Sequence, residues 1–372
     1  MRCNDVLGVI FSNSHDILIR ELTDIRTMGS VPIGGRYRMI DFPLSNMVNS
    51  GIKKVGVITK SNYSSLMDHL GSGKPWDLAR KRGGLSLLPP YGHVGTGIYK
   101  DRIDALQGAM QFLIHSSEKY VLLSDADVIY NFSFEDLLDK HIDNGADITT
   151  VYKYGREPNG QDDTMVYELD GNSRVTSLRV CPGAEENCNF GLDIFLMEKE
   201  FLIHMINEAV SMNKTSFVRD LLQSNLTNMR IFGYEAAGYS AIIDSMQSYF
   251  QANMELLSAD VRAELFDKER PIYTKIRDEV PAKYGLGSHV VNSLVADGCI
   301  IDGRVENCVL FRGVKIGRDS AVSNSVIMQS TNIGTECKLD HVISDKNARI
   351  KDGRTLMGFS SYPVFIRKNS VV

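Results

Sequence analysis

The C-terminal stretch of the chain, from about residue 286 onward, restricts the fold most, because aliphatic residues recur there with a short period. The six-residue spacing joins Leu294 to Ile300, Ile316 to Val322 and Met328, Ile333 to Leu339, and Ile350 to Leu356. A longer repeat begins at Asn292, Asn307, Asn324 and Asp340, with spacings of 15, 17 and 16 residues. Three six-residue units make one coil of roughly 18 residues, so this period with shortened corners predicts a left-handed parallel β-helix. A β-meander or a sandwich is the plainer alternative.

The first 250 or so residues have a different sequence pattern, in which apolar runs alternate with amphipathic segments. This alternation is typical of βαβ units around a mostly parallel sheet. Buried strands are predicted at residues 6–11, 55–59 and 120–124, and a helix is predicted at 103–115. We expect three parts, which are an α/β domain over residues 1–250, a helical linker over 251–285 and the β-helix over 286–372.

Composition excludes several classes of function. The chain has 372 residues, of which 43% are hydrophobic and 23% charged, and its net charge is −5. These values are typical of a soluble globular protein, and nothing in them favours binding to nucleic acid or to an anionic membrane. No apolar run reaches the roughly 18 residues of a membrane span, and no signal peptide is visible before the first strand. Six cysteines without a Cys-x-x-Cys pair argue against zinc and favour a cytoplasmic protein with reduced thiols.

The most specific motif covers residues 12–46, which read SNSHDILIRELTDIRTMGSVPIGGRYRMIDFPLSN. Its second half resembles the N-terminal motif of the bacterial ADP-glucose pyrophosphorylase (glucose-1-phosphate adenylyltransferase) family. That family has A-G-G-x-G-T-R-L-x-x-L-T, followed by R-A-K-P-A-V-P-x-G-G-x-Y-R-x-I-D-F-x-L-S-N. The resemblance implies a Rossmann-like, GT-A-like nucleotidyltransferase domain with a mostly parallel mixed sheet, followed by a left-handed β-helix of hexapeptide repeats.

The first half of the motif has lost the residues that the reaction needs. The loop glycines of the family fall at Asn13, Ser14 and Asp16, its catalytic arginine at Leu18 and its lysine at Met28. A triphosphate loop needs backbone N–H groups close to phosphate oxygens, which glycine permits because it has no Cβ. The transferred phosphoryl group also needs a cation where charge develops. Leucine cannot supply that cation and Asp16 would repel phosphate, so we assign no catalytic residue to this chain.

The resemblance places Asp127 on the family's metal-binding aspartate, which holds Mg²⁺ against the phosphates and so contributes to substrate binding. Asp125 is an alternative candidate for this role. A further alternative is that the carboxylate only caps the next turn and binds no metal. The second carboxylate of the family's metal clamp falls at Ile242, and Asp244 replaces it only if the strand slips locally. We therefore expect Mg²⁺ only because of the family resemblance, since the residues of this chain do not by themselves imply it.

Other family positions that contact substrate are also altered. The lysine that neutralises the sugar phosphate falls at Cys181, and the base-reading glutamines fall at Tyr91 and Gly92. The G-T-A-D-A motif becomes Asp101-Arg102-Ile103-Asp104-Ala105, and S-M-G-I-Y becomes residues 189–193. Of the latter motif only Gly191 is retained, and we keep it as a predicted substrate-binding residue.

Three arginines of the retained half, Arg26, Arg36 and Arg38, are predicted to form a regulatory anion pocket. In the family, basic residues of this stretch line the site for phosphorylated glycolytic effectors. Arginine matches phosphate geometry with two parallel hydrogen bonds. The alternative is that these arginines pair with scaffold carboxylates such as Asp41.

Taken together, the losses resemble those of the non-catalytic, regulatory subunits of GlgD type in this family. The resemblance implies a complex that makes ADP-glucose and pyrophosphate from ATP and glucose 1-phosphate in bacterial glycogen biosynthesis. It also implies a heterotetramer with a catalytic GlgC-type subunit, with a homo-oligomer possible in isolation. Two alternatives stay open, which are a slow but genuine adenylyltransferase and a non-enzymatic scaffold that binds phosphate esters. An acyltransferase that uses His289 or His341 between β-helix coils is disfavoured by the N-terminal motif.

Overall fold

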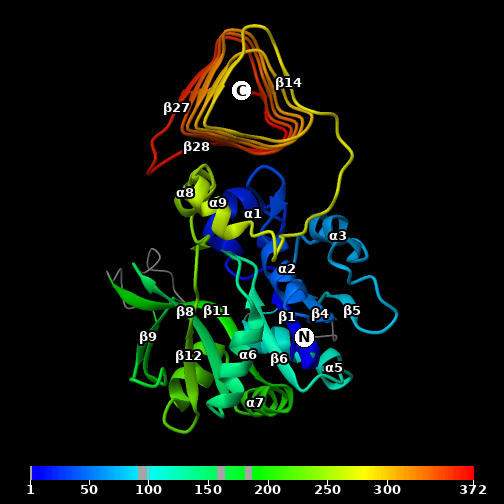
Figure 1. Ribbon diagram of the computed structural model, residues 1–372, viewed down its shortest axis with the longest axis vertical. Coiled ribbons are helices and arrows are strands. Elements are labelled where there is room, and N and C mark those ends of the chain that lie inside the picture. The colour runs from blue at the N-terminus through cyan, green and yellow to red at the C-terminus, as the bar shows by residue number, and fades with distance from the viewer. Residues whose placement is uncertain (1, 91–98, 100, 157–163, 181–186) are drawn as a thin grey trace.

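The computed structural model describes residues 2–90, 99, 101–156, 164–180 and 187–372, which form an α/β part and a triangular β-helix (Figure 1). The β-helix is seen nearly end-on, so its coils overlie one another as a triangle. Two helices, α8 (Met246–Glu255) and α9 (Ala259–Leu265), lie between the two parts.

A mixed sheet forms the centre of the α/β part. Among the described residues its nine strands are β1 (Val6–Phe11), β4 (Lys54–Ile58), β5 (Gly84–Leu88), β6 (Tyr120–Asp125), β8 (Ile148–Gly155), β9 (Met165–Leu169), β10 (Val175–Val180), β11 (Cys188–Glu198) and β12 (Ile231–Glu235). The path runs β10-β9-β11-β6-β1-β4-β5, and β8 pairs with β11 and β12. The strands β4, β1 and β6 are parallel, whereas β11 is antiparallel to β6. The three predicted strands are confirmed as β1, β4 and β6.

Helices cover both faces of this sheet, which explains why β1 is buried along its whole length. Besides α8 and α9, the α-helices of the described residues are α1 (Arg20–Thr23), α2 (Asp41–Asn49), α3 (Ser64–Leu70), α4 (Arg102–Gly108), α5 (Met110–Ile114), α6 (Phe134–Asp143) and α7 (Lys199–Ser211). The helix predicted over 103–115 is in fact two helices, because the chain turns at Ala109. Two small pairs, β2 (Pro32–Ile33) with β3 (Tyr37–Arg38) and β7 (Val128–Tyr130) with β13 (Ser240–Ile242), lie off the main sheet.

The C-terminal part consists of three parallel five-stranded sheets, one for each side of the triangle. The first contains β14 (Lys283–Tyr284), β17 (Ile300–Ile301), β20 (Lys315–Ile316), β23 (Asn332–Ile333) and β26 (Arg349–Ile350). The second contains β15 (His289–Val291), β18 (Arg304–Glu306), β21 (Ala321–Ser323), β24 (Lys338–Asp340) and β27 (Thr355–Met357). The third contains β16 (Leu294–Val295), β19 (Val309–Leu310), β22 (Val326–Ile327), β25 (Val342–Ser344) and β28 (Val364–Ile366). The predicted left-handed β-helix is confirmed.

The longer sequence repeat corresponds to one corner of the triangle. Asn292, Asn307 and Asn324 have φ angles of 41°, 52° and 43°, a left-handed conformation that asparagine tolerates better than most residues. Their side chains also form a ladder, because Asn292 Nδ2 donates to Asn307 Oδ1 at 2.7 Å and Asn324 Nδ2 donates to Asp340 Oδ1 at 2.8 Å. The repeat of 15 to 17 residues therefore marks successive coils at one corner.

The two parts share a hydrophobic core. It combines buried residues of the N-terminal motif, such as Met28 and Phe42, with β-helix residues such as Val326 and Ile343. The segment of residues 266–282, which lies in the predicted helical linker, has neither helix nor strand. It runs along the α/β part, where Tyr273 N–H donates to Ser45 Oγ at 2.9 Å. Within the described ranges, no helix combines the length and the apolar character that crossing a membrane requires.

Candidate functional site

A cavity of about 430 Å³ lies at the carboxyl-terminal ends of β1 and β4. This edge of a parallel sheet is where α/β proteins generally bind ligands. Residues 11–18 form one wall, the start of α4 forms another, and Asp193 of β11 faces them. The altered loop of the sequence motif is therefore a wall of the cavity, as its position after β1 predicts.

The loop is held by its own side chains. Asn13 Oδ1 accepts a hydrogen bond from Lys60 N–H at 2.7 Å, while Asn13 Nδ2 donates to Asp16 Oδ2 at 2.6 Å. Asp16 Oδ1 in turn accepts from Met28 N–H at 2.8 Å. Burial raises the pKa of Asp16 to about 6, so the carboxyl is mainly ionised at neutral pH. A negative charge thus occupies a position where the family's loop approaches phosphate.

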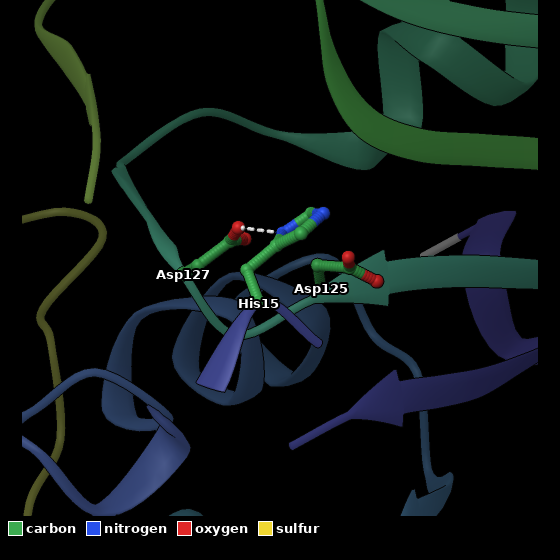
Figure 2. Close-up of side chains that lie close together, drawn as sticks. All are labelled: His15, Asp125 and Asp127. Carbon is green, nitrogen blue, oxygen red and sulfur yellow. Dashed lines mark hydrogen bonds and ion pairs between the residues drawn. The ribbon is translucent and has the colours of Figure 1, made fainter. Parts of the chain in front are cut away.

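His15 contacts Asp127, the aspartate at the position where the family binds its metal ion. Its Nδ1 is 2.7 Å from Asp127 Oδ2, as the dashed line in Figure 2 shows. The backbone of His15 has a φ of 59°, which is uncommon for any residue except glycine and turns the ring inward. Burial alone would lower the pKa of His15, but the hydrogen bond to Asp127 and the charges of nearby aspartates raise it to about 10.

Arg102 neutralises the other acidic groups of the cleft. Its Nη2 is 2.6 Å from Asp125 Oδ2 and 2.7 Å from Asp193 Oδ1. The guanidinium also lies 5.6 Å from the centre of the Phe195 ring, a geometry that favours a cation. Burial, together with the charges of Asp193 and Asp127, raises the pKa of Asp125 to about 7 despite the opposing charge of Arg102. The family motif has a threonine at the position of Arg102, and a threonine there could not form these ion pairs.

The donor set of the cleft does not match Mg²⁺. Among the described residues, His15, Asp125 and Asp127 form one group whose potential ligand atoms lie within 4.8 Å of one another. One buried oxygen of each aspartate, Oδ1, has no hydrogen-bond partner within that part of the chain. Mg²⁺ requires several oxygen ligands, usually carboxylates with phosphates and water. Here the third ligand is an imidazole and both carboxylates already carry an ion pair, so the residues do not fit the ion as they are arranged.

The second carboxylate of the family's clamp is not supplied by Asp244. Strand β13 pairs with β7 so that Ile242 faces Val128. Asp244 lies just before α8, where its Oδ1 accepts from Ser245 Oγ at 3.1 Å and its N–H donates to Ser248 Oγ at 2.9 Å. Asp244 thus takes part in the start of the helix and is not a member of the cluster formed by His15, Asp125 and Asp127.

The remaining substrate positions give little support for binding. Gly191 lies in β11 and does not line the cavity; a Cβ there would lie 2.9 Å from the Tyr167 hydroxyl, so packing already explains the glycine. Its role in substrate binding stays a prediction. The altered positions Cys181, Tyr91 and Gly92 lie outside the described residues.

A second, smaller cavity of about 30 Å³ lies between the two parts of the chain and is lined by cations. Arg36 and Arg38 both line it, and their role in binding an anion stays a prediction. Four further cations that the motif does not reveal also line it, which are Lys275, Arg277, Arg312 and Lys346. They come from the linker and the β-helix, so no local pattern in the sequence links them to the arginines. Burial, together with the charge of Arg277, lowers the pKa of Arg38 to about 10 despite the opposing charge of Asp41.

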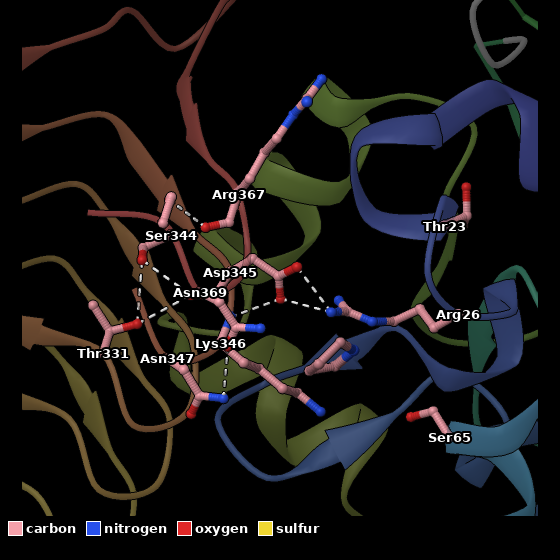
Figure 3. Close-up of polar contacts among 12 residues, drawn as sticks. Thr23, Arg26, Ser65, Thr331, Ser344, Asp345, Lys346, Asn347, Arg367 and Asn369 are labelled. Atoms are coloured by element: carbon pink, nitrogen blue, oxygen red, sulfur yellow. Dashed lines mark hydrogen bonds and ion pairs between the residues drawn. The ribbon is translucent and has the colours of Figure 1, made fainter. Parts of the chain in front are cut away.

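Arg26, the third predicted arginine, does not line this cavity. Its Nη2 lies 2.8 Å from each carboxylate oxygen of Asp345, and both side chains are buried (Figure 3). The alternative of scaffold pairing therefore describes Arg26, although the partner is Asp345 of the β-helix rather than Asp41. This ion pair joins the N-terminal motif to the C-terminal part.

Two regions of the chain match known family models. Residues 19–257 match Nucleotidyl transferase, and residues 280–360 match the GlmU-like C-terminal hexapeptide. The first match alone covers more than half of the chain. The chain belongs to the nucleotidyl transferase family. The match to this family begins immediately after the altered loop of residues 12–18.

Individual members of the family show which of its proteins this chain resembles. The chain is 36% identical to the glycogen biosynthesis protein GlgD of Bacillus subtilis (strain 168), over 99% of this chain and 97% of that protein. It is 38% identical to GlgD of Geobacillus stearothermophilus, over 86% and 83% respectively. It is also 33% identical to the glucose-1-phosphate adenylyltransferase of Clostridium botulinum (strain Alaska E43 / Type E3), over 87% and 84%. The resemblance drawn from the motif is confirmed.

Proposed function

We propose that this chain is a regulatory subunit of a glucose-1-phosphate adenylyltransferase in glycogen biosynthesis, with little or no transferase activity of its own. The observation that carries the proposal is the loop of residues 13–18, whose polar side chains bind the loop and its neighbours instead of presenting N–H groups and cations to a triphosphate. The full-length similarity to GlgD proteins supports the same conclusion.

The two lost cations also support inactivity. Met28, at the position of the family's lysine, is fully buried in the core shared with the β-helix. Leu18, at the position of the catalytic arginine, lines the cavity with an uncharged side chain. Phosphoryl transfer depends mainly on positioning and on cations that stabilise developing charge. The buried methionine, the leucine and the carboxylate of Asp16 provide no cation at these positions.

A catalytic GlgC-type subunit would complete the active complex, in a heterotetramer. This chain would then shift the partner toward its active state, which requires that it contact the active and inactive states differently. The Mg²⁺ that the family's chemistry uses belongs, in this proposal, to the catalytic subunit, because Asp127 carries His15 here. A cytoplasmic location accompanies the proposal, since sugar phosphates and ATP are made there.

The experiment that tests the proposal is an assay of ADP-glucose synthesis from ATP and glucose 1-phosphate. The chain is assayed alone, and then mixed with the catalytic subunit from the same genome. We expect no turnover by the chain alone and a raised rate or an altered effector response in the mixture. Mg²⁺-dependent turnover by the pure chain that Asp127→Asn abolishes would instead establish the slow adenylyltransferase. No effect on the partner, together with phosphate-ester binding, would leave the scaffold as the function.

The regulatory ligand of this proposal is a phosphorylated glycolytic intermediate whose phosphate group binds at the cation-lined cavity, since about 30 Å³ cannot hold the whole molecule. Six cations line it, and the carboxylates nearby pair with only some of them; Asp68, for example, lies 3.0 Å from Lys275 Nζ. Both parts of the chain contribute, so an anion there would hold the β-helix against the N-terminal motif. By fixing the β-helix relative to the N-terminal motif, a bound ligand would change the contacts between subunits.

Replacing Arg38 with alanine should weaken binding of fructose 1,6-bisphosphate to the chain about tenfold or more, because one hydrogen bond to a charged group contributes about 1.5–3 kcal/mol. Arg36→Ala should have the same direction of effect. Isothermal titration calorimetry measures the dissociation constant. The matched control is Arg304→Ala, which removes an exposed arginine from β18. Equal affinity in all variants would refute the pocket.

Anion binding should also depend on pH through Lys346. Burial, together with the charges of Arg38 and Arg26, lowers the pKa of Lys346 to about 7. A bound anion favours the charged amine, so binding takes up a proton wherever the amine of the ligand-free chain is neutral. Sulfate, whose charge is constant in this range, should therefore bind more tightly as the pH falls from about 8.5 to about 6. The dependence should flatten in Lys346→Met; an unchanged slope in that variant would contradict the assignment.

A further inference from the structure

The acidic cleft beside the larger cavity is already occupied by side chains of this chain. Three carboxylates, those of Asp125, Asp127 and Asp193, meet there from two neighbouring strands and the turn after β6. His15 reaches Asp127 from the loop after β1, and Arg102 reaches Asp125 and Asp193 from the first turn of α4. Figure 2 shows the imidazole between the two aspartates of the β6 end.

Because these carboxylates are buried, other groups must lie against them to compensate their charge. The side chains of Asp125 and Asp127 are 1% and 2% exposed, and an uncompensated carboxylate at that depth is costly. In a metal-dependent site a divalent cation provides the compensation. Here Arg102 provides one positive charge to two carboxylates, and His15 donates from Nδ1 to the third. The Oδ1 atoms of Asp125 and Asp127, which have no hydrogen-bond partner among the described residues, remain available as ligand atoms.

We propose that His15 and Arg102 are tethered replacements for the divalent cation, so that this cleft is complete without metal and His15 is the group that excludes it. The proposal concerns the ligation chemistry of this chain and holds whether or not the chain regulates a partner. It predicts that removing the imidazole exposes Asp127 and the neighbouring Oδ1 of Asp125 to cations from the solvent.

The backbone offers a clean variant for this test. His15 has a left-handed φ of 59°, which glycine adopts without strain, so His15→Gly removes the ring and leaves the loop conformation available. Asn213→Gly is the matched control, since Asn213 has a φ of 56° and is exposed at the end of α7. Both substitutions create a glycine at a left-handed position, and only one touches the cleft.

Binding of Mn²⁺ alone to the full chain, followed by the electron paramagnetic resonance signal of the free ion, measures the effect without any assay of activity. We expect His15→Gly to bind one Mn²⁺ about tenfold or more tightly than the unmodified chain and the control. The double variant His15→Gly/Asp127→Asn should lose this gain. Equal binding by the unmodified chain and His15→Gly overturns the proposal, as does a gain that survives Asp127→Asn.

Thermal unfolding gives a second readout should His15→Gly be poorly folded. A ligand that binds the native state raises the melting temperature by mass action. Mn²⁺ should therefore raise the melting temperature of His15→Gly and leave that of the unmodified chain unchanged. His15→Asn, which also tolerates the left-handed backbone, should respond in the same direction. A melting temperature of the unmodified chain that rises as much as that of the variants contradicts the idea of an internal replacement.

Discussion

Replacing Arg26 with alanine should lower the free energy of unfolding by about 3–5 kcal/mol, the cost typical of removing one partner from a buried ion pair. Arg26 and Asp345 are 2% and 1% exposed, and both oxygens of Asp345 lie 2.8 Å from Arg26 Nη2. Without the guanidinium, Asp345 remains buried with one backbone N–H, that of Lys346, on its carboxylate. Urea denaturation followed by circular dichroism measures the change.

The control for this prediction is Arg230→Ala. Arg230 pairs with Asp147 at 2.8 Å but is 57% exposed, and such pairs contribute only about 0–1 kcal/mol. A second variant guards against loss of folding. In Arg26→Met/Asp345→Leu no buried charge is left alone, so its stability should exceed that of Arg26→Ala. Similar losses in Arg26→Ala and Arg230→Ala would show that the ion pair between the two parts contributes nothing special.

Replacing Gly317 with alanine should destabilise the β-helix by about 1–3 kcal/mol, as expected for overpacking against atoms that cannot move aside. A Cβ at Gly317 would lie 2.4 Å from the carbonyl oxygen of Gly334 and 2.7 Å from its carbonyl carbon. These are backbone atoms of the next coil, and they are fixed by the hydrogen bond from Gly334 N–H to Ile350 O at 2.9 Å. The coils would have to separate locally to admit the methyl group.

Gly287→Ala is the matched control for Gly317→Ala. Gly287 lies in the first coil, and nothing lies within 4 Å of a Cβ built there. Its replacement should therefore change stability little or raise it slightly, because alanine restricts the unfolded chain more than glycine does. Differential scanning calorimetry of the two variants compares them directly. Equal melting temperatures would mean that the spacing between coils adapts more easily than the contacts suggest.

Much of the fold could be predicted because its parts follow local rules. The strand of residues 6–11 is a continuous apolar run, and the asparagine repeat marks a corner that each coil needs in left-handed conformation. The break between α4 and α5 at Ala109 was missed, because both helices keep the apolar spacing of one continuous helix. Residues 266–282 lie in the predicted helical linker, yet they form neither helix nor strand, and hydrogen bonds to Ser45 and Asn49 hold them against the α/β part. Tertiary contacts of this kind have no signal in local sequence.

The candidate site was predictable where it depended on substitutions within one motif. The loss of glycine and lysine at Asp16 and Met28 is visible in the sequence, and the structure adds that the two residues bond to each other. The roles of His15 and Arg102 were not foreseen, since their partners lie 112 and 23 residues away at the end of β6. The cations Lys275 and Arg312 have no signal for the same reason, because the linker and the β-helix must fold back before these side chains approach Arg38.

The core shared by the two parts also has a consequence for how the protein is made. Ribosomes release the N-terminus first, and domains generally fold as they emerge. The buried side chains of residues 19–42, however, share their core with residues 309–343 as well as with residues 129–272, so this core is complete only when the β-helix coils have left the ribosome. The nascent chain must therefore carry Met28 and Phe42 without their β-helix partners until synthesis is almost finished. A message cut short in the last coils would leave an apolar surface at the N-terminal end of the protein, far in sequence from the missing codons.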